Sequence, residues 1–545
     1  MADHFDFIVV GGGSAGCVAA TRLVRDGGAR VLLIERGQER QPPLLQIPAG
    51  YMKYLAREDF LEMHETVAQP QLDGRAPIVP QAKILGGGSS VNAMVYMRGQ
   101  REDYDGWDAL LGGNAGWSYE DVLPHFRALE RNTKLNDEYH GVDGPLWVSD
   151  PGRIDPLTEA FMLAAQGLGV RYNPDFNGAR QAGVGPMPHT IGRARRCHAA
   201  GAFLSQIRRA PRFTLETQAT ASRVLIENGR AVGVEYSRGG DTRRAYADTE
   251  VLVAAGTYNT AKLLMLSGLG PADHLASHSV PVVCDLPGVG QNLQDHHEVP
   301  VISSVREPGG YFGQDRGWRM LRNGLEYLLF KSGRAATTGV EACAFVDPDG
   351  SERPTIQLYC VPTVYLDRDV KDVTATHGVT LTPCLLRPKA RGSVRLRSAN
   401  PFDKPVVDSN FFGDADDLRM TLAAMRYARR ILAQEPLASR VREEMAPGPG
   451  AQSDADLARY AKRMVKTNYH PVGTARMGPD GDPHAVLDPR LRVRGVQGLR
   501  VVDCAAIPSI VSGNTNAAAM MLGDRAATFI LHSPNVRSAP VSSGR

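Results

Sequence analysis

Residues 5–16 read FDFIVVGGGSAG, an apolar run that passes directly into a cluster of glycines. A helix-like stretch, CVAATRLVR, follows over 17–25, and a second apolar run, RVLLI over 30–34, ends at Glu35. This order predicts a strand, a tight turn, a helix and a second strand, which together make one β-α-β crossover of about thirty residues. A crossover of this kind opens a doubly wound α/β sheet, so we predict a Rossmann-like fold for the N-terminal region.

The glycines of this stretch have the spacing of a dinucleotide-binding turn. Gly11 permits the tight turn, Gly13 lets the backbone approach a pyrophosphate, and Gly16 lets the helix pack closely on the strand. The start of the helix also offers N–H donors and partial positive charge. We therefore expect a dinucleotide to contact Gly11, Gly13, Ser14, Ala15 and Gly16.

Glu35 stands at the end of the second predicted strand, 19 residues after Gly16. A carboxylate at this place accepts a hydrogen bond from a ribose 2′-hydroxyl and disfavours the 2′-phosphate of NADP. These residues by themselves leave both NAD and FAD open.

Composition narrows the class of protein. The chain has 545 residues, is 43% hydrophobic and carries a formal net charge of +3, which argues against binding to nucleic acid. No apolar run approaches the roughly 18 residues of a membrane span, and we expect no secretory signal at the N-terminus. Seven cysteines without a C-x-x-C pair indicate free thiols in a reducing compartment. We expect a cytoplasmic enzyme with no metal site, and its oligomeric state stays open.

Five further blocks of sequence carry a family resemblance. In chain order they are AKILGGGSSVN (82–92) with MRG (97–99), GTYNTAKLLMLSGLG (256–270), DLPGVGQNLQD (285–295), YHPVGT (469–474) and SGNTN (512–516). Together they resemble the signatures of the glucose–methanol–choline (GMC) flavoprotein oxidoreductases, in the family's order and over nearly the whole chain. The resemblance implies that the dinucleotide is FAD.

The resemblance also implies a two-part architecture. The expected fold is α/β overall: a Rossmann-like FAD-binding domain of GMC type and a second, substrate domain built on an antiparallel sheet with helices. The FAD-binding domain would take residues 1–155, 213–300 and 481–532, the last segment carrying the active-site Asn. The substrate domain would take 156–212 and 301–480, and 533–545 would be a flexible tail.

The second glycine cluster is expected to approach the cofactor, because three glycines and two serines let the backbone pass close to a flat or charged group. Some relatives have a histidine at the position of Val91 that bonds covalently to the flavin. Valine cannot form that bond, so we predict non-covalent FAD. The other cofactor contacts that the resemblance implies are Gly86, Gly87, Ser90, Asn92, Ala93, Ala221, Asp503, Asn516 and Ala517.

Two residues align with the family's active site. His470 matches the catalytic histidine, and Asn514 matches a second position that is His or Asn across the family. Alcohol oxidation by a flavin needs a base for the hydroxyl proton, and histidine titrates near neutral pH. We expect His470 to take that proton, Asn514 to orient the alcohol oxygen, and a hydride to pass to flavin N5. Asn468 and Tyr469 flank the base and are expected to line the pocket.

The predicted reaction is the FAD-dependent oxidation of a primary alcohol to an aldehyde. The electrons then pass to O2 or to another acceptor such as a quinone. The first alternative is a hydroxynitrile lyase, which shares the fold without net redox use. A choline-type dehydrogenase is the second. The His470 and Asn514 pair disfavours a flavin-binding sensor. The family signatures, which fit flavin, disfavour an NAD-linked dehydrogenase.

Other clusters of functional residue types have simpler interpretations. Asp295-His296-His297-Glu298 contains metal-ligand types, but adjacent side chains point in different directions, so we interpret the run as structural. The basic run over 193–196 is interpreted as a solvated surface. Glu341 could face a cationic substrate, as in choline-oxidising relatives, but an ordinary solvated glutamate is the preferred interpretation.

Overall fold

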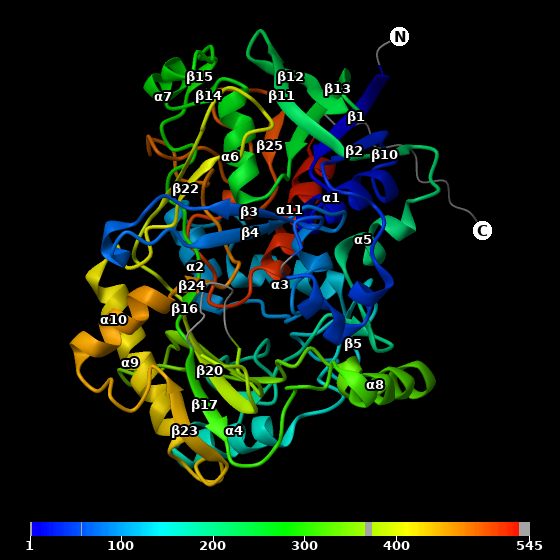
Figure 1. Cartoon of the computed structure of the whole chain (residues 1–545). Helices are drawn as coiled ribbons and strands as arrows, with labels where there is room; N and C mark the ends of the chain where they lie inside the picture. Colours follow the sequence, from blue (N-terminus) through cyan, green and yellow to red (C-terminus); the bar gives the residue numbers. More distant parts are fainter. Residues whose placement is uncertain (1–2, 56, 366–372, 534–545) are drawn as a thin grey trace.

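The structure, a computed structural model, describes residues 3–55, 57–365 and 373–533 (Figure 1). Two large sheets organise it, one in the upper half of Figure 1 and one in the lower half. The expected fold class, a Rossmann-like α/β unit with a second, antiparallel unit, is confirmed.

The first sheet has seven strands in the order β10-β2-β1-β13-β12-β11, with β25 also beside β13. Strands β10, β2, β1, β13 and β25 are parallel, whereas β12 and β11 continue the sheet as an antiparallel hairpin. The strands are β1 (Asp3–Val10), β2 (Val31–Glu35), β10 (Phe213–Thr217), β11 (Ala219–Glu227), β12 (Arg230–Arg238), β13 (Asp241–Val253) and β25 (Leu499–Val501).

The predicted crossover is present, since β1 and β2 are parallel neighbours joined by helix α1 (Ser14–Arg25). Gly16 is required there because a Cβ at this position would lie 2.0 Å from the Gly11 carbonyl oxygen. Helix α11 (Asn516–Leu531) packs against α1, and a Cβ at Gly523 would lie 2.4 Å from the Ala15 carbonyl oxygen. Close packing of these two helices brings both of their N-termini to one place.

The second sheet has eight strands and is antiparallel, in the order β23-β17-β20-β19-β18-β7, with β16 and β24 attached. Its central strand β20 is buried along its whole length, because helices cover one face and the other faces the interior. The strands are β7 (Gly183–Pro186), β16 (His297–Glu298), β17 (Val301–Val305), β18 (Ala342–Val346), β19 (Ile356–Val361), β20 (Gly378–Leu385), β23 (Val441–Ala446) and β24 (Lys466–Thr467).

Helices α4 (Pro156–Gly167) and α9 (Ala415–Leu432) contact this sheet, and α10 (Asp454–Met464) packs on α9. The other helices are α2 (Arg101–Leu110), α3 (Tyr119–Leu129), α5 (Ala199–Ala202), α6 (Thr257–Leu266), α7 (Ala272–Ser277), α8 (Gly317–Phe330), and the 3-10 turns η1 (Pro43–Gln46), η2 (Pro48–Lys53), η3 (Pro70–Leu72), η4 (Gly87–Ser90), η5 (Leu204–Gln206), η6 (Arg334–Ala336) and η7 (Cys504–Ala506). Within the described ranges, no helix is long and apolar enough to cross a bilayer.

Five two-stranded pairs complete the structure: β3 (Leu61–Glu65) with β4 (Ile78–Ala82), β5 (Glu130–Asn132) with β6 (Leu146–Val148), β8 (Ile191–Gly192) with β9 (Arg195–Arg196), β14 (Leu269–Gly270) with β15 (Cys284–Asp285), and β21 (Ser393–Arg395) with β22 (Val406–Asp408). The β3–β4 hairpin lies between the two sheets in Figure 1. The predicted tail lies almost entirely outside the described residues.

Candidate active site

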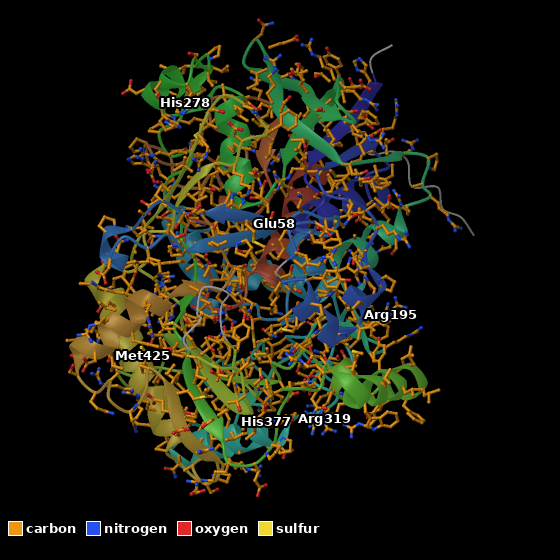
Figure 2. The ribbon with its side chains drawn as sticks, viewed as in Figure 1. Glu58, Arg195, His278, Arg319, His377 and Met425 are labelled. Carbon is orange, nitrogen blue, oxygen red and sulfur yellow. The ribbon has the colours of Figure 1, made fainter. Side chains whose placement is uncertain are left out.

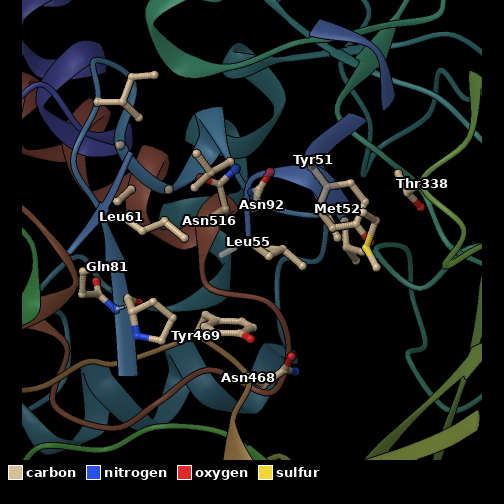
Figure 3. A pocket seen from close by; sticks show the side chains of 18 of the residues that line it. Tyr51, Met52, Leu55, Leu61, Gln81, Asn92, Thr338, Asn468, Tyr469 and Asn516 are labelled. Carbon is tan, nitrogen blue, oxygen red and sulfur yellow. Dashed lines mark hydrogen bonds between the residues drawn. The ribbon is translucent and has the colours of Figure 1, made fainter. Parts of the chain in front are cut away.

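A cavity of about 1070 Å³ lies between the glycine loops of the first sheet and the inner face of the second. Figure 3 shows part of its wall, with Asn92 and Asn516 near the glycine-rich side and Asn468 and Tyr469 on a neighbouring loop. His470 and Asn514 line the same cavity. The residues predicted for catalysis and many of those predicted for the cofactor therefore share one space.

The two ring nitrogens of His470 have different partners. Its Nδ1 lies 3.0 Å from Nδ1 of His296, whose own Nε2 lies 2.9 Å from the Leu386 carbonyl oxygen. A carbonyl only accepts, so the hydrogen of neutral His296 is on Nε2, and its Nδ1 is an acceptor. His470 therefore donates from Nδ1 and keeps an unprotonated Nε2, which is the nitrogen that a base needs.

Asn514 presents its amide NH2 to that nitrogen. Its Nδ2 donates to His470 Nε2 over 3.2 Å. Its Oδ1 accepts from Gln357 Nε2 at 3.3 Å and from the Tyr359 hydroxyl at 3.4 Å. Because both partners are donors, the amide is held with its NH2 group toward the histidine. An alcohol oxygen placed here can accept from Asn514 and donate to His470.

Burial shapes the protonation of this site. It holds the pKa of His470 well below the ordinary 6.5, with the neighbouring His296 ring as a further cause. Burial also lowers the pKa of His296 to about 4. Both rings are therefore neutral at pH 7, as the tautomer argument requires.

Asp295 anchors the backbone that carries the base. Its Oδ1 accepts from the His470 backbone N–H at 2.9 Å, and its Oδ2 accepts from the Thr467 hydroxyl at 2.6 Å. Burial raises the pKa of this carboxyl to about 7, although these hydrogen bonds oppose the shift. The neighbouring Tyr469 has φ of 64°, so the loop turns sharply just before the histidine.

The two glycine loops pack directly on each other. The Gly86 backbone N–H donates to the Gly12 carbonyl at 2.7 Å, and a Cβ at Gly87 would lie 2.7 Å from the Gly13 Cα. By contrast, a Cβ at Gly88 or Gly256 would meet no atom within 4 Å. Both of these glycines line the cavity, so their backbones offer open, unobstructed surface to a ligand.

A flavin dinucleotide fits the polar groups at this wall. Helix α1 begins at the cavity with no acidic residue in its first turn and no side-chain cap on its N–H groups. Such a helix start attracts a phosphate. The Ser14 hydroxyl donates to Asn516 Oδ1 at 2.7 Å, which leaves Asn516 Nδ2 buried without a partner among the described residues. Asn259 Oδ1, also at the cavity, has no such partner either.

Most of the predicted cofactor residues line the cavity, and four do not. Those in the wall are Gly11, Gly13, Ser14, Ala15, Glu35, Gly87, Asn92, Ala93, Ala221, Asp503 and Asn516. Gly16, Gly86, Ser90 and Ala517 are placed behind it. The Ser90 hydroxyl donates to the Leu85 carbonyl at 2.8 Å and accepts from Gln41 at 2.7 Å, so this side chain shapes the loop.

Two of the carboxylates that line the cavity accept hydrogen bonds from the protein backbone. Glu35 accepts from the Gly12 and Gly37 N–H groups at 2.8 and 2.6 Å. Asp503 accepts from the Gly256 N–H at 2.9 Å and from the Thr260 hydroxyl at 2.6 Å. Each carboxylate thereby fixes a glycine turn of the cofactor wall, a role that the motif spacing did not reveal.

The run 295–298 needs a partial correction. Adjacent side chains do point apart: His296 contacts His470, whereas His297 lies 3.3 Å from the Thr421 hydroxyl and packs on Phe412. The run is nevertheless part of the active site through His296 and Asp295, and the sequence analysis missed this. Its position at the end of the block 285–295 was the available signal. The described residues contain no group of three or more His, Cys, Asp or Glu that could hold a metal ion.

The interpretation of Glu341 as a solvated residue was wrong. Its side chain is fully buried and accepts from the Tyr311 hydroxyl, from the Thr337 hydroxyl at 3.1 Å and from the Asp155 backbone N–H at 2.6 Å. Burial raises its pKa. Glu341 is outside the cavity wall, where Asn468 and Tyr469 are placed as expected.

Comparison with known proteins gives a consistent result. Two models described as GMC oxidoreductase match residues 5–298 and 388–523. An oxygen-dependent choline dehydrogenase of Brucella ovis is 39% identical to this chain, and the alignment covers 98% of this chain and 97% of that protein. The human mitochondrial choline dehydrogenase is also 39% identical, over 98% of this chain and 90% of its own.

Solved structures agree. Pyridoxine 4-oxidase from Mesorbium loti superposes with a TM-score of 0.88 at 29% identity, covering 97% of this chain and 99% of that one. A fungal aryl-alcohol oxidase gives a TM-score of 0.85 at 25% identity, covering 97% and 99%.

Proposed function

Because the chain belongs to the GMC oxidoreductase family, and is therefore an FAD-dependent enzyme that acts on CH–OH donors, we propose that it oxidises a primary alcohol to an aldehyde with His470 as the base. One observation carries the proposal: the unprotonated Nε2 of His470 and the NH2 of Asn514 lie 3.2 Å apart at the cavity that the glycine loops line.

The residues of the chain divide the work as follows. The substrate hydroxyl donates to His470 Nε2 while its oxygen accepts from Asn514 Nδ2. As the C–H bond breaks, the hydroxyl proton moves to Nε2, and the Asn514 amide stabilises the negative charge that develops on oxygen. His296 accepts from Nδ1 throughout, which keeps the imidazole oriented.

FAD, when bound, supplies the acceptor for the hydride. We propose that the start of α1, the glycine loops, Asn516 and Asp503 hold it without a covalent bond, since Val91 lines the wall where some relatives carry histidine. Acid precipitation should release free flavin into the supernatant. Flavin retained by the precipitate would show a covalent bond.

We propose that the substrate is uncharged. Four carboxylates line the cavity among the described residues, and each already has a partner. Besides Glu35 and Asp503, Glu298 pairs with Lys466 at 3.1 Å, and Asp315 pairs with Lys53. Away from the cofactor wall, where Glu35 and Asp503 accept from neutral donors, a quaternary ammonium group would therefore find no carboxylate without a cationic partner. Choline is the second candidate, because the relatives named above act on it by name.

One experiment tests reaction and substrate together. Anaerobic stopped-flow mixing should bleach the flavin absorbance with 3,3-dimethylbutan-1-ol, a neutral shape-mimic of choline, and bleach it more slowly with choline. Faster bleaching by choline would favour the second candidate. Absence of bleaching by any alcohol of a broad panel would contradict oxidation and favour the lyase alternative.

The same experiment identifies the acceptor and tests the base. Addition of O2 or of a quinone to the bleached enzyme shows which one restores the absorbance. His470→Ala should slow bleaching at least about a hundredfold.

We also propose that the domain boundaries are those given above and that the protein is cytoplasmic. All seven cysteines lie in the described part of the chain, and all are free thiols.

A further inference from the structure

Helix α8 is apolar on its outer side and polar on its inner side. The side chains of Trp318, Leu321, Leu325 and Leu328 are each more than half exposed. Their spacing of three and four residues puts them on one face. The neighbouring Leu329 and Phe330 are 67% and 72% exposed. A surface helix ordinarily turns such a face toward the core, and a continuous exposed apolar patch marks an interaction site.

Polar side chains hold the helix to the rest of the molecule. Asn323 and Tyr327 are its two buried residues. Asn323 Nδ2 donates to the Gln314 carbonyl at 3.0 Å, and the Tyr327 hydroxyl donates to the Ala194 carbonyl at 2.9 Å. The orientation of α8 is therefore fixed by hydrogen bonds on its inner side, and the apolar face points away from the protein.

Cations surround this apolar face. Residues 316–331 contain four basic residues (Arg316, Arg319, Arg322 and Lys331) and one acidic one (Glu326), which gives a net charge of +3. The 193–196 loop that Tyr327 touches adds the exposed side chains of Arg193 and Arg195. In Figure 2, Arg195 and Arg319 are labelled near the two sides of α8, which projects from the body of the molecule (Figure 1).

We propose that α8 docks on the surface of a bilayer that contains anionic lipid. An apolar face with Trp and Leu, framed by Arg and Lys, is the composition of helices that lie in the plane of a membrane interface. Basic residues near such a surface are attracted to anionic headgroups, and the long stems of arginine reach them while the apolar side chains insert. The inference stands whether or not the proposed alcohol oxidation is correct.

A second copy of the chain is the other occupant to consider, and charge disfavours it. A two-fold interface would place the same patch on both subunits, and so would bring two positively charged segments together. Arg316 of this segment lies 3.8 Å from Asp315, whereas Arg319, Arg322 and Lys331 form no ion pair with a described residue, so such an interface would leave these three facing like charges. An anionic lipid surface neutralises the same groups.

The position of α8 gives docking a consequence for the enzyme. Met320, Asn323 and Gly324 of this helix also line the cavity that His470 lines. A docked α8 would bring this wall of the cavity to the lipid surface, where apolar alcohols and lipid-soluble electron acceptors concentrate.

Vesicle sedimentation tests the proposal on the holoenzyme. We expect binding to vesicles of phosphatidylcholine mixed with phosphatidylglycerol, and at least about tenfold weaker binding to phosphatidylcholine alone or at high salt. The triple variant Leu321→Ser/Leu325→Ser/Leu328→Ser should lose at least about tenfold in partitioning. Phe402→Ser, at an equally exposed aromatic outside α8, is the matched control and should bind like the native protein.

Trp318 provides a fluorescence test on the native protein. It is the exposed one of four tryptophans, since Trp107 and Trp117 are fully buried and Trp147 is half-buried. Brominated anionic lipid should therefore quench its fluorescence, and Trp318→Phe should abolish that quenching. A native protein that stays in the supernatant without quenching would overturn the proposal. So would a triple variant that binds as well as native, or a native dimer that the triple variant dissociates.

Discussion

The chemistry proposed for His470 depends on which of its nitrogens carries hydrogen. The chain from Leu386 through His296 fixes the hydrogen on Nδ1, so the lone pair on Nε2 faces Asn514. His296 is therefore a positioning residue, in the way that a carboxylate orients a catalytic histidine in other enzymes. The reaction needs no titration of His296, because its low pKa keeps it neutral and able to accept.

This arrangement predicts the pH dependence of flavin reduction. The pKa of His470 is held well below 6.5, so the base stays unprotonated as the pH falls through 6.5, and the rate should decline only in more acidic solution. Anaerobic stopped-flow measurements across pH test this. Asp295 has a pKa of about 7, so its protonation is expected to change the rate near that pH, and Asp295→Asn would remove this change. A fall in the rate at or above pH 6.5 that persists in Asp295→Asn would contradict a lowered His470 pKa.

Replacement of His296 tests the positioning role. In His296→Leu no group accepts a hydrogen bond from His470 Nδ1. The imidazole can then adopt the tautomer with its hydrogen on Nε2, and molecules in that tautomer have no base at Nε2. We expect flavin reduction to slow by at least about tenfold. His296→Gln can donate to Leu386 and accept from His470, and should restore much of the rate. Equal rates in the two variants would show that His296 only fills space.

Sequence reasoning reached His470 and Asn514 because each lies inside a short contiguous block. It missed His296 as an active-site residue because the contact joins positions 174 residues apart. Pairing of β16 with β24 brings the two histidines together, and the adjoining block 285–295, although it points to the active site, does not indicate that pairing.

At the scale of elements, the cofactor wall depends on two glycine turns that touch. Gly87 has φ of 54°, and a Cβ there would lie 2.7 Å from the Gly13 Cα, which is backbone and cannot move aside. Gly87→Ala should therefore separate the turns and lower the flavin content of the purified protein. Gly106→Ala is the control, because that position is inside α2 and a Cβ would meet nothing within 4 Å.

The control has an expected outcome of its own. Alanine is favoured over glycine inside a helix, so Gly106→Ala should bind flavin normally and raise the unfolding free energy by about 0.5–1 kcal/mol. The ratio of flavin to protein absorbance measures the flavin content, and thermal melts measure the change in stability. Normal flavin content in Gly87→Ala would mean that the turns can separate without loss of the site.

Elements differ in how far the sequence predicts them. The β1-α1-β2 crossover follows from its own thirty residues. The outward direction of the apolar face of α8 could not be predicted in this way, because apolar periodicity ordinarily indicates the side of a helix that is buried. Only the contacts of Asn323 and Tyr327 show which side of α8 faces the protein.

At the scale of the whole molecule, Asp103 connects the segments that hold the active site in register. Its two oxygens accept from the Gln100 backbone N–H at 2.8 Å, from the Ser512 N–H and hydroxyl at 2.6 and 2.9 Å, and from Arg353 at 2.9 Å. These donors come from the start of α2, from the loop that leads to Asn514, and from the β18–β19 connection. One buried carboxylate thus joins the N-terminal, central and C-terminal parts of the chain.

Asp103→Asn should weaken both stability and catalysis. The amide NH2 would face a donor that the carboxylate now satisfies, and a buried unsatisfied group costs about 1–3 kcal/mol of unfolding free energy. Because Ser512 is two residues from Asn514, flavin reduction should slow while the flavin stays bound. Glu102→Gln, one residue away on the exposed side of α2, should stay within about 0.5 kcal/mol of native. Denaturant melts and anaerobic reduction rates measure the two effects, and an Asp103→Asn enzyme with native values of both would show that these segments are held together elsewhere.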